Sequence, residues 1–179
     1  MDTTIDTSTT ASAGPPDVPA AADAAQVADV AARIADSIGG VLAGRRDAIE
    51  TAIACLLSAG HLLIEDIPGV GKTLLAQALA SSVGGSFHRI QGTPDLLPGD
   101  VTGTMMPHGD GFDLRFRAGP IFSNIVVFDE LNRANPRTQS ALLEATEEAA
   151  VTVDGVTREL PAPFLLVATQ NPLEMTGTY

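Results

Sequence analysis

Apolar residues recur along this chain at two spacings, and the alternation of the two predicts a layered α/β domain. Helical spacing fits four segments, at 23–38, 45–58, 72–83 and 136–148. Short apolar runs typical of strands lie between and after them, at 61–65, 86–90, 125–128 and 164–168. Strands that alternate with helices in this way favour a mainly parallel sheet flanked by helices.

Two further segments predict β-hairpins inserted into this pattern. Met105 and Phe112–Phe116 flank the turn sequence Gly109-Asp110-Gly111, and Val151–Leu160 contains Asp154-Gly155 at its centre. The run at 61–65 has almost no polar residue between its ends, so it is predicted to be a strand buried on both faces of the sheet.

Composition and charge narrow the class of protein. Residues 1–22 are mostly Thr, Ala, Ser, Pro and Asp, so we expect a disordered tail there and a folded domain over 23–179. The net charge of −12 argues against binding to nucleic acid or to an anionic membrane. The single cysteine excludes an intrachain disulfide. With neither a signal peptide nor a long apolar run, we expect no membrane span and a cytoplasmic location.

A glycine-rich stretch between a predicted strand and a predicted helix has the spacing of a phosphate-binding loop. It reads Asp66-Ile67-Pro68-Gly69-Val70-Gly71-Lys72-Thr73, which is G-x-x-x-x-G-K-[ST] with Asp66 in place of the first glycine. The glycines let the backbone approach phosphate oxygens, and the following helix offers unpaired N–H groups to the anion. Lys72 should reach the β- and γ-phosphates, and the Thr73 hydroxyl should bind Mg²⁺. The alternative is a glycine turn with a solvated lysine.

Two acidic residues end the apolar run at 125–128. The carboxyl edge of a parallel sheet is where ligands of open α/β folds bind, so Asp129 and Glu130 are placed there. Asp129 would hold Mg²⁺, directly or through water, and Glu130 would orient and polarise an attacking water. Taken alone, the pair could equally begin a loop or cap a helix. Its position after the phosphate-binding loop favours the functional interpretation.

Asn171 lies shortly after the last predicted strand. At that edge it could hydrogen-bond the γ-phosphate or the attacking water. From spacing alone, an ordinary Asn171-Pro172 turn is the slightly better interpretation.

Taken together, residues from about 44 to 179 resemble the MoxR family of AAA+ ATPases. The resemblance rests on five segments: Glu65–Ala76, Arg89-Ile90-Gln91 with Thr93–Pro98, Gly119–Phe122, Asp129–Ala145 and Ala168–Pro172. The Glu-Asp start of the phosphate-binding loop is familiar in this family.

The resemblance implies roles that spacing leaves open. It places Asn171 at the sensor-1 position and adds Leu74 to the residues expected at the nucleotide. It implies ATP and Mg²⁺ as cofactors, a chaperone-like ATPase, a homo-oligomeric ring (a hexamer) in the complete protein, and a partner with a von Willebrand factor type A domain. The hairpin at 101–116 resembles the insertion within helix 2 that marks this clade.

The same resemblance predicts that 23–179 is an incomplete AAA+ domain. Family members continue into a last core strand, an arginine finger and a helical lid, so the strand at 61–65 should become an exposed sheet edge. An arginine finger contributes strongly to rate, so we expect weak or no ATP hydrolysis by this chain alone. The alternative function is a nucleotide-binding interaction module without hydrolysis.

Overall fold

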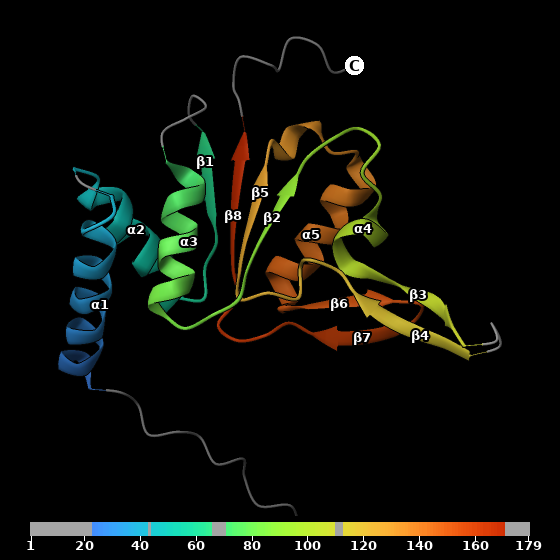
Figure 1. Cartoon of the computed structure of the whole chain (residues 1–179), viewed down its shortest axis with the longest axis horizontal. Coiled ribbons are helices and arrows are strands. Elements are labelled where there is room, and N and C mark those ends of the chain that lie inside the picture. The colour runs from blue at the N-terminus through green and yellow to red at the C-terminus, as the bar shows by residue number, and fades with distance from the viewer. Residues whose placement is uncertain (1–22, 43, 66–70, 110–112, 171–179) are drawn as a thin grey trace, which may run out of the picture.

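A parallel sheet of four strands runs through the centre of the computed structural model, which describes residues 23–42, 44–65, 71–109 and 113–170. Its strands, in spatial order, are β1 (Leu62–Glu65), β8 (Leu165–Gln170), β5 (Ile125–Asp129) and β2 (Phe87–Gln91) (Figure 1). All three neighbouring pairs are parallel. The predicted α/β class, with a parallel sheet flanked by helices, is confirmed.

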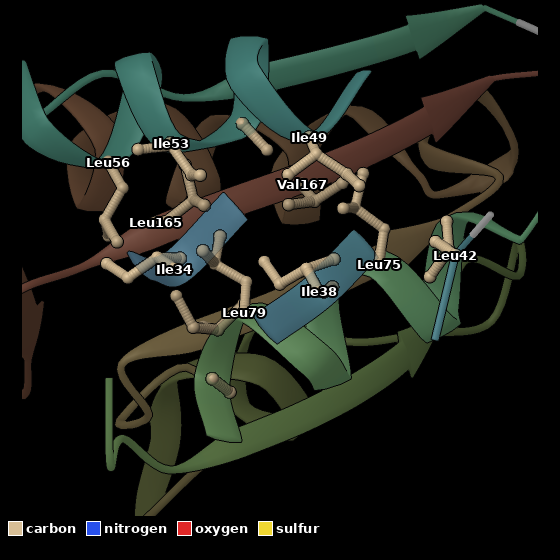
Figure 2. Packing of buried hydrophobic residues seen from close by; sticks show 14 of the residues in the cluster. Ile34, Ile38, Leu42, Ile49, Ile53, Leu56, Leu75, Leu79, Leu165 and Val167 are labelled. Carbon is tan, nitrogen blue, oxygen red and sulfur yellow. The ribbon is translucent and has the colours of Figure 1, made fainter. Parts of the chain in front are cut away.

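Three helices pack on one face of this sheet. They are α1 (Ala24–Gly39), α2 (Arg46–Leu57) and α3 (Lys72–Ser82). Their buried isoleucines and leucines meet Leu165 and Val167 of β8, as Figure 2 shows. Leu79 of α3 and Ile38 of α1 have no exposed surface. Apolar burial of this kind, rather than helix propensity alone, is what holds such helices in place.

The other face carries a second apolar cluster, which includes Val126, Phe128 and Leu142. It is built around α5 (Pro136–Glu148), the short helix α4 (Pro98–Thr102) and the 3-10 helix η1 (Leu131–Arg133). The Asn135 side chain caps α5 by accepting a hydrogen bond from the Thr138 backbone N–H at 3.0 Å. The sheet therefore separates two cores.

The two predicted hairpins are present, near α4 and α5 (Figure 1). One pairs β3 (Gly103–His108) with β4 (Asp113–Ala118), and the other pairs β6 (Ala150–Val153) with β7 (Val156–Glu159). The Arg158 guanidinium of β7 lies over the Phe116 ring of β4, 4.0 Å from its centroid. This cation–π contact joins the two hairpins.

The strand β1 differs from the prediction for 61–65 in one respect. It is the edge of the sheet, as expected, but it is not buried on both faces, because Leu63 is 55% exposed and Glu65 is exposed. The side chains of Leu62 and Ile64 pack against the core formed with α1, α2 and α3. The opposite face of this edge strand is left largely uncovered, and an apolar run alone could not reveal that.

Several predictions from the sequence concern residues that are not described. The tail at 1–22, the first five residues of the phosphate-binding loop, and Asn171 lie outside the described ranges. Within the described ranges, no helix is both long and apolar enough to span a membrane.

Candidate nucleotide-binding site

The start of α3 and the end of β1 bracket the predicted phosphate-binding loop. Asp66, Ile67, Pro68, Gly69 and Val70 lie outside the described residues. Gly71 is the N-cap of α3 with φ of 89°, a left-handed conformation that favours glycine. Figure 1 shows α3 beginning at the end of the sheet where the parallel strands finish. The backbone N–H groups of the first turn of α3 therefore lie at the carboxyl edge of the sheet.

The next three residues form the first turn of α3. Lys72 and Thr73 are half-buried, whereas Leu74 is 43% exposed and Leu75 is buried in the core. Lys72, Thr73 and Leu74 are the first three residues of α3 and so lie at the loop end of the helix, where the sequence predicted contacts with nucleotide.

Strand alternation decides which face of the sheet carries the acidic residue Asp129. Ile125 and Val127 of β5 point into the core beneath α3, so Asp129, two residues later, lies on the same face. By the same rule Thr169 follows Val167 of β8 on that face. Asp129 is therefore on the side of the sheet that α3 covers.

Both oxygens of the Asp129 carboxylate have partners from neighbouring strands. The Thr169 hydroxyl of β8 donates to Oδ1 at 3.2 Å, and Nε of Arg89 on β2 donates to Oδ2 at 2.6 Å. The Asp129 side chain is only 14% exposed. A carboxylate this buried depends on such partners, because an unpaired buried charge is costly.

Glu130 is held at its backbone and at its carboxylate. Its φ of 56° is left-handed, and its backbone N–H donates to the Thr169 hydroxyl at 3.0 Å. Oε2 accepts a hydrogen bond from Gln91 Nε2 at 2.6 Å and pairs with Arg133 NH1 at 3.1 Å. Both contacts go to the same oxygen. A positive φ in a residue other than glycine is unusual, and such conformations cluster at functional sites.

The loop after β2 leaves no space beside Glu130. The Gly92 backbone N–H donates to the Asp129 carbonyl at 2.7 Å. A Cβ at Gly92 would collide with the Glu130 carbonyl oxygen. Glycine at position 92 therefore lets β2 and the end of β5 approach each other closely.

Four residues whose side chains contact the two acids received no role from the sequence: Thr169, Arg89, Gln91 and Arg133. All four appeared only within segments that carry the family resemblance. A signal was nevertheless present, since Phe87, Arg89 and Gln91 alternate along β2 and so share one face of the sheet. Only the structure shows the strand register, which pairs Gln91 with Asp129 and brings Arg89 and Gln91 to the two acids.

The last described residue, Gln170, precedes Asn171. Its Nε2 donates to Oε1 of Glu65, which joins the ends of β8 and β1. The predicted roles of Asn171 stay predictions.

The oxygen atoms that side chains offer at this edge of the sheet are of a kind that binds magnesium. A carboxylate oxygen of Asp129 and the hydroxyl of Thr73 are hard oxygen ligands of the kind that Mg²⁺ prefers. The Asp129 carboxylate already pairs with one positive charge, the Arg89 guanidinium, through Oδ2. The residues present therefore fit the group that the sequence predicted.

Comparisons with known proteins show which family the chain is similar to. Residues 61–179 match the model of the ATPase family associated with various cellular activities (AAA). The uncharacterized protein YeaC of Bacillus subtilis is 54% identical over 144 residues, covering 80% of this chain and 45% of YeaC. The chaperone MoxR1 of Mycobacterium tuberculosis is 44% identical over 139 residues, covering 78% of this chain and 37% of MoxR1. A crystal structure of a candidate ATPase from Cytophaga hutchinsonii has a TM-score of 0.76 and 41% identity, over 87% of this chain and 47% of that one.

The chain belongs to the ATPase family associated with various cellular activities (AAA). Within that family its relatives include MoxR proteins, which confirms the resemblance predicted from the sequence. The chain spans less than half the length of the curated relatives reported above.

Proposed function

We propose that this chain forms the Mg-ATP-binding centre of a MoxR-type ATPase and that the complete protein hydrolyses ATP. The observation that carries the proposal is the position of Asp129 at the carboxyl edge, on the side of the sheet where α3 begins, with Glu130 directly after it. An anion bound at the first turn of α3 and a cation held at Asp129 would thus be neighbours, as a nucleotide with its magnesium requires.

Each residue then has a defined task. Lys72 binds the β- and γ-phosphates. The phosphate-binding loop consists of Gly71 and the five residues before it, and Leu74 contacts the nucleotide from the first turn of α3. Thr73 and Asp129 would hold Mg²⁺, which would supply positive charge to neutralise the phosphates. Asn171 would hydrogen-bond the γ-phosphate or the attacking water.

Glu130 orients the attacking water and polarises it. Because Gln91 and Arg133 both contact Oε2, we assign Oε1 to the water. Holding one oxygen fixes the direction of the other, and positioning of this kind is the main contribution that proteins make to phosphoryl transfer.

The test measures ATP binding and phosphate release in the full-length protein and in two variants. Lys72→Ala should weaken ATP binding, because it removes a charge from the phosphates. Glu130→Gln should keep binding and lose turnover, because an amide is a poor base. Arg115→Gln, on the exposed face of β4, is the matched control and should change neither quantity. Unchanged turnover in both site variants would refute the proposal.

The second candidate is a nucleotide-binding interaction module without hydrolysis. It is favoured by the Asp129–Arg89 and Glu130–Gln91 contacts, which engage both acids within the chain itself. ATP binding without phosphate release at any protein concentration would support it. Turnover that rises as the protein assembles would refute it and would support the proposed homo-oligomeric, hexameric ring.

A chaperone-like role for the complete protein follows from the same family membership. A partner with a von Willebrand factor type A domain remains part of this proposal. Co-purification of such a protein with full-length chain, lost when ATP binding is removed by Lys72→Ala, would support the partnership. Equal recovery with and without ATP binding would show that nucleotide does not control it.

A further inference from the structure

The ion pair between Arg89 and Asp129 differs from the other ion pairs among the described residues. Its acidic side chain is 14% exposed, whereas the acids of the others are 29% to 69% exposed. The Arg89 side chain itself is 55% exposed. The pair therefore joins an acid fixed within the site to a cation that can move into solvent.

Geometry explains how Arg89 reaches this acid. Arg89 is in register with Val127 of β5, so its side chain extends diagonally to Asp129, two residues further along the neighbouring strand. The backbone of Arg89 is fixed in the sheet. Only the side chain has to rotate for the ion pair to open.

The two oxygens of Asp129 have different partners, and this difference decides where a metal could enter. Oδ1 accepts a hydrogen bond from Thr169, which is buried with only 4% exposed. Oδ2 accepts a hydrogen bond from Nε of the partly exposed Arg89 guanidinium at 2.6 Å. A metal ion, or a water bound to it, that approached Oδ2 would need the position now taken by Arg89 Nε.

We propose that Arg89 is a positioning residue that holds Asp129 in the absence of metal and is displaced when Mg²⁺ arrives with nucleotide. This inference rests on the proposed function, because it takes Asp129 to be the metal-binding carboxylate. The guanidinium and the metal compete for Oδ2. Before metal binds, the ion pair with Arg89 compensates the charge of the Asp129 carboxylate and fixes its orientation. Metal binding includes the opening of this ion pair.

The test uses Mn²⁺ as the probe, with ADP present to supply phosphates but no hydrolysis. Free Mn²⁺ is followed by electron paramagnetic resonance. Removing the competitor with Arg89→Gln should tighten Mn²⁺ binding by roughly two- to fivefold, the range that a partly exposed ion pair supports. Arg89→Lys should lie between wild type and Arg89→Gln, since lysine keeps the charge without the planar donor set.

The matched control is Arg115→Gln, which removes another strand arginine paired with a neighbouring acid, Asp113, away from the site. It should leave Mn²⁺ affinity unchanged. Unchanged or weaker Mn²⁺ binding by Arg89→Gln, with ADP binding intact, would overturn the exchange while leaving the proposed function in place. Failure of the wild-type chain to bind ADP with Mn²⁺ would count against the proposed function itself.

Thermal unfolding provides a second readout that does not depend on affinity. In EDTA, Arg89→Gln should unfold at a lower temperature than wild type, because Asp129 loses a partner. With saturating Mg²⁺ and ADP the two midpoints should converge, because the ion pair is then open in wild type too. An equal loss of stability in both conditions would assign the pair a purely structural role and would overturn the proposal.

Discussion

Replacing Thr169 with valine removes one hydroxyl group on which both acidic residues depend. That hydroxyl accepts the Glu130 backbone N–H at 3.0 Å and donates to Asp129 Oδ1 at 3.2 Å. Thr169 is 4% exposed, so water cannot easily replace it. Valine keeps the branched shape and the strand preference, so the change isolates the polar contacts.

The expected loss of stability can be worked out from these two contacts. Leaving a buried donor unpaired costs about 1–3 kcal/mol. The longer bond to Asp129 adds little, because Arg89 still neutralises that carboxylate. We therefore expect Thr169→Val to lower the free energy of unfolding by about 2 kcal/mol, the middle of that range. For a chain of this length, that corresponds to a drop in melting temperature of about 4–8 °C.

Urea unfolding followed by circular dichroism measures this loss, with Thr157→Val as the control. Thr157 is an exposed strand residue of β7 whose hydroxyl contacts only Thr152 among the described residues, so its replacement should stay within about 0.5 kcal/mol of wild type. If Thr169→Val unfolded at the same urea concentration as Thr157→Val, the hydroxyl would not be supporting the two acids, and the account of their placement would be refuted.

Three other substitutions test separate parts of the fold. Gly92→Ala should cost about 1–3 kcal/mol in unfolding free energy and reduce ATP turnover of the full-length protein, because its Cβ collides with the Glu130 carbonyl; unchanged turnover would contradict this. Leu79→Ala, at a position with no exposed surface, should lower unfolding free energy by about 2–5 kcal/mol in urea, and a loss below 1 kcal/mol would mean that the core under α3 is loosely packed. The Thr93 hydroxyl lowers the pKa of Asp95, so any stability it adds is present above the ordinary aspartate pKa and lost as pH falls through the lowered value. Thr93→Val should raise the pKa of Asp95 in an NMR titration, and an unchanged pKa would remove the hydroxyl as its cause.

The sequence predicted elements well where periodicity and turn chemistry agree. The helix predicted at 136–148 matches α5 residue for residue, because Asn135 caps it and Pro136 opens it. The turn predicted at Asp154-Gly155 joins β6 to β7, and both residues have positive φ. These signals are local, so the neighbouring residues alone determine them.

What the sequence could not predict depends on contacts between distant segments. The short helix α4 has only five residues, too few to show helical spacing of apolar residues, so the sequence pattern did not predict it. The left-handed backbone of Glu130 is not a preference of glutamate, and it became visible only with β8 and β2 packed on either side. Arg89 and Thr169 meet at Asp129 from strands 80 positions apart in sequence (169 − 89), and only the strand order brings them together.

Successive side chains of β5 pack into different cores, one on each face of the sheet. Val127 belongs to the core under α3, whereas Val126 and Phe128 belong to the core under α5 and the hairpins. Leu131, directly after Glu130, packs against that second core. A movement of the Glu130 backbone would therefore also displace a side chain that is packed in the core on the far side of the sheet from α3.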